Sequence, residues 1–554
     1  MQNKFKSALD FTKKYFFCKT AGILMLFLFG AGLLSVWLEQ EVISDFLMYH
    51  YYNGYAFLND RLTVDIAPAK IATYYNPLLD TVLYLLDNTF SKTPYLFIMG
   101  LPAGLALFIV YKIADLFFTD KKIIWISASL LVSLTGFAFF RQIGTCSHEI
   151  TLACFILGAL YILLKTPKKS VWYFIAGALL GSAAGFKLTA ALYCVSTGIT
   201  LILFYKTLEK PKTFIGLFVL GGLTGFLAVN GFWMWTLWKN FQNPFFPFWN
   251  KIFKSPYFFN DNYVDDLHLS YDWKKLLFLP FLIFYENTFD PHQLFAKQLV
   301  ANIPFSDARW MIGFFLLIAF SVRLWCRSFR QSVSGKTLFL TTFMLLSYLI
   351  WLFSSQNIRF VIPIEMLFGL VFLKALSSCP YPKNFFKEIM ADSITFILFA
   401  ILVATPLFSE SWGSYYRAFL PETALIPPKT LILTTGSHIS YYAVKFLERT
   451  DGRIINSITP NVIMHYNFSD YNKFIELKKD IIKQNKNTVV FLIHLKKGKI
   501  PNIKNNACYL FEIHPFNGNY DFYICSKPDI IKTMLINTSL EANTEKDGHH
   551  HTEK

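Results

Sequence analysis

The amino-acid sequence predicts an all-α polytopic membrane bundle of about eleven transmembrane helices, with a small α/β domain at its C-terminal end. Hydrophobic residues make up 54% of the 554 residues and charged residues only 16%, whereas about a quarter is usual in a soluble domain. The mean hydropathy of +0.39 reflects long apolar runs in the first 408 residues. After residue 408, short strand-like and helical segments alternate instead, as in an α/β domain.

The first apolar run follows a basic N-terminus and covers residues 20–38. No A-x-A-like cleavage site follows it, so we interpret it as a transmembrane helix with a cytoplasmic N-terminus and not as a signal peptide. Ten further runs approach the length that crosses a ~30 Å hydrocarbon layer. They are about 94–118, 122–141, 149–164, 171–187, 188–205, 213–238, 309–327, 337–354, 358–376 and 391–408.

Residues 171–205 need a turn, because one helix of this length would extend about 52 Å. The segment GSAAGFKLT, which contains Lys187, is the expected turning point. With eleven spans, all six clusters of Lys and Arg fall on the cytoplasmic side, as the positive-inside rule requires. The segments 39–93 and 240–308 and everything after residue 408 then lie on the periplasmic side of a bacterial inner membrane.

The formal charge of +16 is explained by these clusters between apolar runs. A nucleic-acid-binding protein gathers Lys and Arg on a soluble face instead, so we expect membrane lipids and no nucleic acid as partners. The chain has no P-loop and no G-x-G-x-x-G after a strand, which excludes the usual nucleotide-binding motifs. The eight cysteines are scattered without ligand-like spacing, so no metal site is predicted.

The C-terminal part divides into an α/β domain at 409–535 and a disordered tail at 536–554, after a membrane domain at 1–408. Near the end of the α/β domain, CYLFEIH-PFNGNY-DFYICS is typical of a hairpin. Symmetric pairing places Cys508 opposite Cys525. In an oxidising compartment the two cysteines either form a disulfide or remain unlinked on neighbouring strands, and the sequence leaves both alternatives open.

The first outer segment is rich in polar residues between two amphipathic pieces. Residues 44–58 predict a helix at the outer surface whose apolar side faces lipid or the bundle, and 77–90 predict a second piece too short to span comfortably. This segment and four later ones resemble the GT-C superfamily of polyprenyl-phosphate-sugar-dependent glycosyltransferases. The similar motifs are SDFLMYHYYNGYAFLNDR, APAKIATYYNPLLD, GSAAGFKLTA, QNPFFPFWNKIFKSPYF and SSQNIRFVIPIEMLFGL. One departure is GTCSHEI, where many relatives carry an acidic or Asn-Asp pair.

The resemblance implies a glycosyltransferase that moves a hexosyl or pentosyl group from a polyprenyl-phosphate-linked donor to a glycan, lipid or protein acceptor. In this family an acidic residue after the first span is the catalytic base, which implies Asp45, with Glu39, Glu41, Asp65 and Asp80 as reserves. Direct displacement would invert the anomeric centre. No soluble cofactor is required, and the sequence leaves open whether a divalent metal assists.

Cations are needed to stabilise the departing phosphate, and polar groups to bind the substrates. The candidate substrate-binding residues are His50, Asp65, Asp80, Arg141, His148, Glu149, Lys187 and Arg359. Several catalytic and binding candidates also have a structural alternative. Examples are Asp45 as a helix N-cap, Lys187 as a snorkelling side chain and Arg141 as an interface anchor.

Two other classes of function remain at this stage. A transporter or flippase of lipid-linked saccharides should show inverted repeats and ionisable residues near mid-membrane. We find no clear repeat, and the charges lie at the ends of the apolar runs. A scaffold that presents the α/β domain would need fewer spans. The sequence therefore favours the enzyme.

Overall fold

The computed structural model describes most of the helical part of the chain and the strands of the C-terminal part. The described residues are 2–39, 45–118, 122–165, 168–262, 272–289, 307–324, 334–377, 429–435, 441, 443–444, 452–456, 472–485, 489–496, 507–511 and 520–526. The chain forms two compact units. Unit 1 comprises Met1–Glu41, Lys92–Phe232 and Val264–Ser414, and unit 2 comprises Val42–Ser91, Trp233–Tyr263 and Tyr415–Lys554.

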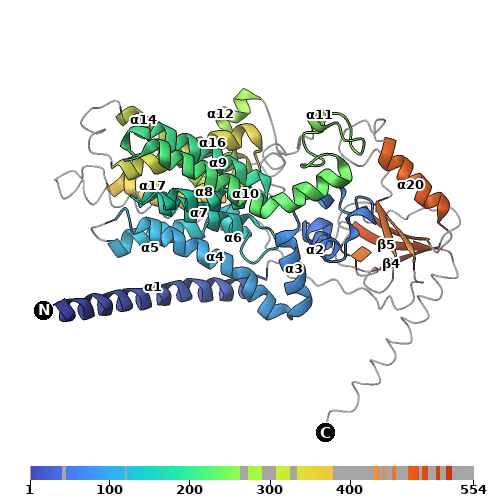
Figure 1. The fold of residues 1–554 in the computed structure, drawn as a ribbon, viewed down its shortest axis with the longest axis horizontal. Coiled ribbons are helices and arrows are strands. Elements are labelled where there is room, and N and C mark those ends of the chain that lie inside the picture. Colours follow the sequence, from blue (N-terminus) through green and yellow to red (C-terminus); the bar gives the residue numbers. More distant parts are fainter. Residues whose placement is uncertain are drawn as a thin grey trace, which may run out of the picture. The chain divides into compact units, whose positions relative to one another are not determined.

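Unit 1 is a bundle of apolar helices. Its α-helices are α1 (Gln2–Leu38), α4 (Lys92–Ala114), α5 (Lys122–Leu134), α6 (Phe137–Arg141), α7 (Glu149–Leu164), α8 (Val171–Phe186), α9 (Ala191–Leu203), the first part of α10 (Pro211–Phe241), α12 (Trp273–Phe289), α14 (Ala308–Leu324), α16 (Gly335–Ser354) and α17 (Ile362–Ser377). Three short 3-10 helices join them: η4 (Leu188–Ala190), η5 (Tyr205–Thr207) and η6 (Ile358–Val361). The long helix α1 lies alongside α4 (Figure 1).

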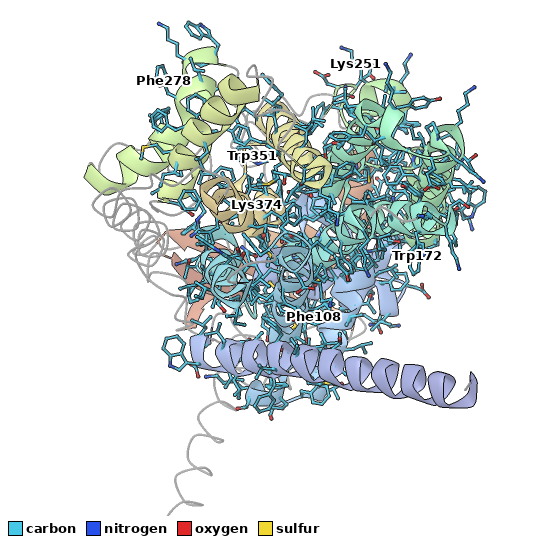
Figure 2. The ribbon with its side chains drawn as sticks, turned by 90° about the vertical axis from the view of Figure 1, so that its left-hand side faces the viewer. Phe108, Trp172, Lys251, Phe278, Trp351 and Lys374 are labelled. Carbon is cyan, nitrogen blue, oxygen red and sulfur yellow. The ribbon has the colours of Figure 1, made fainter. Side chains whose placement is uncertain are left out.

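Four helices among the described residues are long and apolar enough to cross a membrane: Thr20–Leu38 within α1, α4, α10 and α16. Shorter apolar helices cover Ile123–Leu134, Glu149–Leu164, Val171–Phe186 and Leu188–Leu203. Trp351 lies inside the bundle with no exposed surface, whereas Phe278 lies at its edge and is 53% exposed (Figure 2). The predicted span at 391–408 lies outside the described residues.

The predicted span at 122–141 is divided in the structure, because α5 ends at Leu134 and α6 begins at Phe137. The break occurs at Gly136, whose ψ of 131° is not helical. A Cβ atom at this position would collide with the side chains of Glu365 and Arg309. Glycine is therefore required where two buried charged side chains approach the backbone.

The expected turn within 171–205 is confirmed, and it falls at Lys187, which adopts an extended conformation between α8 and η4. The preceding glycines have another role. A Cβ atom on Gly177 or Gly181 would strike the backbone of α10, and one on Gly221 would strike the backbone of α8. Small residues thus allow α8 and α10 to pack backbone against backbone, as is common between membrane helices.

Unit 2 contains the first outer segment and a five-stranded sheet. Its helices are the π-helical turn η1 (Phe46–His50), α2 (Tyr51–Leu58), η2 (Arg61–Thr63), η3 (Lys70–Tyr74), α3 (Leu78–Thr89), α11 (Asn250–Phe253) and α20 (Asn472–Gln484). The strands are β1 (Leu431–Thr435), β2 (Arg453–Asn456), β3 (Val489–Lys496), β4 (Ala507–Phe511) and β5 (Tyr520–Ser526), in the order β2-β1-β3-β5-β4. Strand β1 pairs in parallel with β2 and β3, and β5 pairs antiparallel with β3 and β4.

The predicted strands and hairpin of the C-terminal part are confirmed, including the register that places Cys508 opposite Cys525. Cys525 is disulfide-bonded, so the alternative of unlinked cysteines is wrong for this residue. The strands share a hydrophobic core with the outer segments, since Leu431 and Leu433 pack with Phe246 and Phe258. The predicted domain boundary at 408/409 and the tail at 536–554 lie outside the described residues.

The helix expected at 44–58 is present, but it is divided between η1 and α2. Its aromatic side is buried and does not face lipid: Phe46, Tyr49, Tyr52 and Tyr55 are each 8% exposed or less. The second predicted piece, 77–90, forms α3. Gly54 of α2 lies against the backbone of Asp80 and Cβ of Tyr84, so α2 and α3 pack closely through this glycine.

Candidate functional site

A charged group in unit 1 joins three segments that are far apart in the sequence. Glu149 is the first residue of α7, and Lys187 ends α8. The Lys187 Nζ atom lies 2.5 Å from the Glu149 Oε1 atom. The Glu149 side chain is 4% exposed and that of Lys187 is 22% exposed. The chain therefore buries the carboxylate and leaves part of the lysine accessible.

Arg359 of η6 is the second cation of this group, since it lies close enough for its charge to act on the Glu149 carboxylate. The Asn357 Oδ1 atom accepts a hydrogen bond from the Arg359 backbone N–H and so begins η6. The Tyr193 hydroxyl donates to the Phe360 carbonyl at 2.7 Å, which ties η6 to α9. The Lys187 Nζ atom lies 5.5 Å from the centre of the Phe360 ring.

The group therefore contains two cations and one carboxylate, an excess of one positive charge. A buried carboxylate holds the cations in place, and the excess charge favours an anion. A phosphate group has the charge and the acceptor oxygens that such a pair binds well. Three sequence-predicted residues, Glu149, Lys187 and Arg359, are thus brought together by the fold.

Two other predicted residues of unit 1 lie on the segment between α6 and α7. His148 occupies the N-cap position of α7, where its side chain makes no capping hydrogen bond. Arg141 ends α6, with its guanidinium carbon 6.0 Å from the centre of the Phe137 ring. Both residues take part in further interactions.

The position of α6 depends on charges that the sequence analysis did not single out. The backbone N–H groups of Ala138 and Phe139 donate to Glu365 at 3.1 and 2.8 Å. Arg309 donates to the carbonyl oxygens of Val132 and Thr135, both at 3.1 Å. Glu365 and Arg309 are each 1% exposed. Glu365 lies inside the apolar run 358–376, where an ionisable residue is expensive and signals a special role, so the signal for Glu365 was available in the sequence.

In unit 2, His50 and Asp80 form a buried pair. The His50 Nδ1 atom lies 2.6 Å from Asp80 Oδ1, and Asn53 donates to Asp80 Oδ2 at 3.1 Å. Asp80 lies in the first turn of α3, where the helix dipole favours a negative charge. The carboxylate therefore holds the imidazole in the tautomer protonated at Nδ1. Imidazole and carboxylate also ligate divalent metals, and we assign no metal to this pair.

Asp45 begins the π-helical turn that carries His50. Its side chain is half-buried and makes no capping hydrogen bond to this turn. The alternative role of Asp45 as a side-chain N-cap is therefore not supported by the geometry. Short π-helical segments are rare and are frequently found at functional sites. Asp45 and His50 are placed at the two ends of this segment.

In unit 2, three residues hold the Asp65 carboxylate by hydrogen bonds. Arg61 binds both of its oxygens, at 2.7 and 2.9 Å, the Tyr52 hydroxyl donates to Oδ2, and the backbone N–H of Ile454 in β2 donates to Oδ1. Burial and the adjacent Asp65 carboxylate raise the pKa of Tyr52 well above 10.0. Four hydrogen bonds occupy the carboxylate, so Asp65 joins the first outer segment to the sheet.

Replacing Asp65 by Asn is expected to destabilise unit 2 by about 3–5 kcal/mol, because Arg61 would remain largely buried without its charge partner. The measurement is hydrogen exchange of β2 and of residues 61–66 in the full-length protein, with thermal unfolding alongside. The double variant Arg61→Met/Asp65→Asn should recover part of the protection. Unchanged exchange in Asp65→Asn would show that this ion pair does not hold the segment to the sheet.

No protein-family model and no curated protein matches this chain. Its structure is similar to that of ArnT from Cupriavidus metallidurans bound to undecaprenyl phosphate, with 10% identity and a TM-score of 0.48, over 92% of this chain and 98% of that chain. The apo state of the same protein gives 10% identity and a TM-score of 0.48, over 93% and 98%.

Proposed function

We propose that this protein is a membrane glycosyltransferase that moves a sugar from a polyprenyl-phosphate-linked donor to a cell-envelope acceptor. The observation that carries this proposal is the group of Lys187, Arg359 and Glu149, which offers an excess positive charge at the end of apolar helices. A lipid-linked phosphate needs this combination, cations beside an apolar surface for the lipid tail.

Transfer requires cations at the bond that breaks. When the acceptor oxygen attacks the anomeric carbon, the bond from that carbon to the phosphate oxygen breaks and negative charge grows on the phosphate. Lys187 and Arg359 stabilise this charge because they are already held in position by Glu149 and by Asn357. No charge has to be recruited from solvent during the reaction. Direct displacement of this kind inverts the anomeric centre.

Transfer also requires a base for the proton of the acceptor hydroxyl. Asp45 takes this proton in our proposal, since it follows the first span and lies at the start of the π-helical turn that carries His50. The adjacent pair of His50 and Asp80 binds the acceptor, with Asp80 fixing the imidazole tautomer. Asp65 supports this segment through its bonds to Arg61 and β2, and does not bind the substrate.

The reaction takes place on the periplasmic side of a bacterial inner membrane in this proposal. The disulfide at Cys525 supports this orientation of the C-terminal part, because disulfides persist in oxidising compartments and are rare in the cytosol. The proposal includes the eleven spans and a division into a membrane domain at 1–408 and an α/β domain at 409–535. The acceptor is a glycan, lipid or protein, and the sugar is a hexose or pentose.

The test uses the full-length protein reconstituted in vesicles with radiolabelled undecaprenyl-phosphate sugars and extracts of the cell envelope as acceptors. The proposal predicts free undecaprenyl phosphate and labelled acceptor, in an amount that depends on time and on protein. Movement of the intact lipid-linked sugar across the bilayer without cleavage would instead identify a flippase and would overturn the proposal. Donors with different sugars identify the sugar that is transferred.

A further inference from the structure

The loop that follows α10 in unit 2 has an internal framework built by two asparagines. Asn243 Nδ2 donates to the Phe248 carbonyl, and Asn243 Oδ1 accepts from the Phe245 N–H. Asn250 Nδ2 lies within 3.1 Å of the carbonyl oxygens of Ser255, Phe258 and Phe259, and Asn250 Oδ1 accepts from the Ser255 N–H. Both asparagines are fully buried. Much of the polar backbone of this loop is therefore satisfied from within.

The same framework turns large apolar side chains outward. We define the aromatic patch as Trp238, Phe245, Trp249, Ile252 and Phe253. Its rings are contiguous: the Phe245 ring centre lies 4.9 Å from that of Trp249 and 6.2 Å from that of Phe253, and Phe253 lies 6.4 Å from Trp238. Ile252 is 69% exposed, Trp238 48% and Trp249 43%. The half-buried rings of Phe245 and Phe253 link these exposed side chains, so the patch is continuous on a braced loop.

Positive charge borders the aromatic patch. Lys239, Lys251 and Lys254 are all exposed, and Figure 2 shows Lys251 at the outer edge of the loop. The sequence from 210 to 260 contains no Asp or Glu. The charge therefore suits an anionic surface. Aromatic rings beside lysines, at the end of a helix long and apolar enough to span, are the usual composition of the membrane–water interface.

We propose that the aromatic patch inserts into the outer interface of the lipid bilayer, where Lys239, Lys251 and Lys254 bind the phosphates of anionic lipids. Insertion is inexpensive for this loop because Asn243 and Asn250 already satisfy backbone groups that would otherwise lose water. Other apolar residues of the loop, Phe246, Phe258 and Phe259, are buried in unit 2. The division between inward and outward aromatic residues is thus built into the loop.

The patch is rigidly connected to the first outer segment. The Tyr75 ring stacks on Phe248 with centres 6.0 Å apart, and the Tyr74 ring contacts Phe246 at 4.7 Å. The Trp233 Nε1 atom donates to the Tyr74 carbonyl at 2.9 Å. Insertion of the patch therefore holds the segment that carries Asp45, His50 and Asp80 at a fixed height above the bilayer centre.

The test places an environment-sensitive fluorophore on Ile252→Cys in the full-length protein, with Cys508 and Cys525 retained and the other cysteines replaced. The protein is reconstituted in vesicles of phosphatidylcholine with or without phosphatidylglycerol. Leu477→Cys is the matched control, because Leu477 is an aliphatic residue of α20 that is 40% exposed in the same unit. Nitroxide-labelled lipids are expected to quench the label at 252 and not at 477, and aqueous iodide should do the reverse.

The charge is tested by Lys251→Gln and Lys254→Gln in the labelled protein. In vesicles with phosphatidylglycerol, the equilibrium constant between the labelled loop in the lipid interface and the loop in water should fall about fivefold for each lysine removed. Iodide quenching at 252 equal to that at 477 would overturn the proposal. The proposal would also be overturned if the label at 252 were protected from both quenchers to an extent that grows with the amount of protein per vesicle. A second copy of the chain would then cover the patch. These outcomes do not depend on glycosyl transfer.

Discussion

Replacing Lys187 by Met is expected to lower the rate of sugar transfer by about 10²–10³-fold, the usual cost of removing one preorganised group that stabilises developing charge. The departing phosphate would keep Arg359 as a cation and would lose Lys187, the cation that binds Glu149. Lys187→Arg keeps the charge and should retain much more activity than Lys187→Met. The measurement is the initial rate in the vesicle assay, with saturating donor.

A structural role for Lys187 predicts a different pattern. In Lys187→Met, the buried Glu149 side chain loses the cation that lies 2.5 Å from it, and this loss can destabilise the bundle by itself. The double variant Lys187→Met/Glu149→Gln removes this charge and should restore stability without restoring transfer. Transfer at the wild-type rate in the double variant would show that Lys187 serves the fold alone.

Replacing Asp45 by Asn is expected to lower transfer by about 10²–10⁴-fold while expression and folding are unchanged, because a general base contributes about this factor. The substitution is nearly isosteric, and Asn is as good an N-cap as Asp. The Asp45 side chain makes no capping hydrogen bond to η1, so the variant keeps the shape of the side chain and loses its capacity to accept a proton. The measurement is transfer by the purified variant over a range of pH.

Asp60→Asn is the matched control for Asp45→Asn. Asp60 is an exposed carboxylate of the same segment with a φ of 50°, which Asn tolerates well. Its variant should transfer at the wild-type rate, because Asp60 takes no part in the proposed reaction. A loss of rate shared by both variants would instead indicate an effect of charge on the whole segment. Full activity in Asp45→Asn would remove Asp45 from the mechanism and leave the pair of His50 and Asp80 as the next candidate.

The apolar runs and the local turn signals predicted most of the helices. Glu149–Leu164 matches the predicted span residue for residue, and α8 ends at Lys187 where the length of 171–205 demanded a turn. These features are local, since they depend on hydropathy and on the length that crosses the bilayer. The break at Gly136 is not local. It depends on Glu365 and Arg309, which arrive from distant segments, so periodicity alone extended the helix through it.

The candidate residues show the same difference between local features and contacts with distant segments. The motifs that resemble the family contain Lys187 and Arg359, and the departure GTCSHEI contains Glu149. None of these motifs indicated that the carboxylate would lie 2.5 Å from the lysine. Asp65 and Asp80 were alike in the sequence, and only the fold distinguishes them: Asp65 is occupied by Arg61 and β2, whereas Asp80 is paired with His50. Long-range pairing of this kind cannot be derived from spacing along one segment.

The most direct measurement is binding of undecaprenyl phosphate to the full-length protein, followed by native mass spectrometry, with undecaprenol as the lipid that lacks the phosphate. We expect that undecaprenyl phosphate binds, that undecaprenol does not compete, and that the variant Lys187→Met/Glu149→Gln/Arg359→Met no longer prefers the phosphate. Equal binding of the phosphate by a folded variant of this kind would contradict the assignment of Lys187 and Arg359 as its cations.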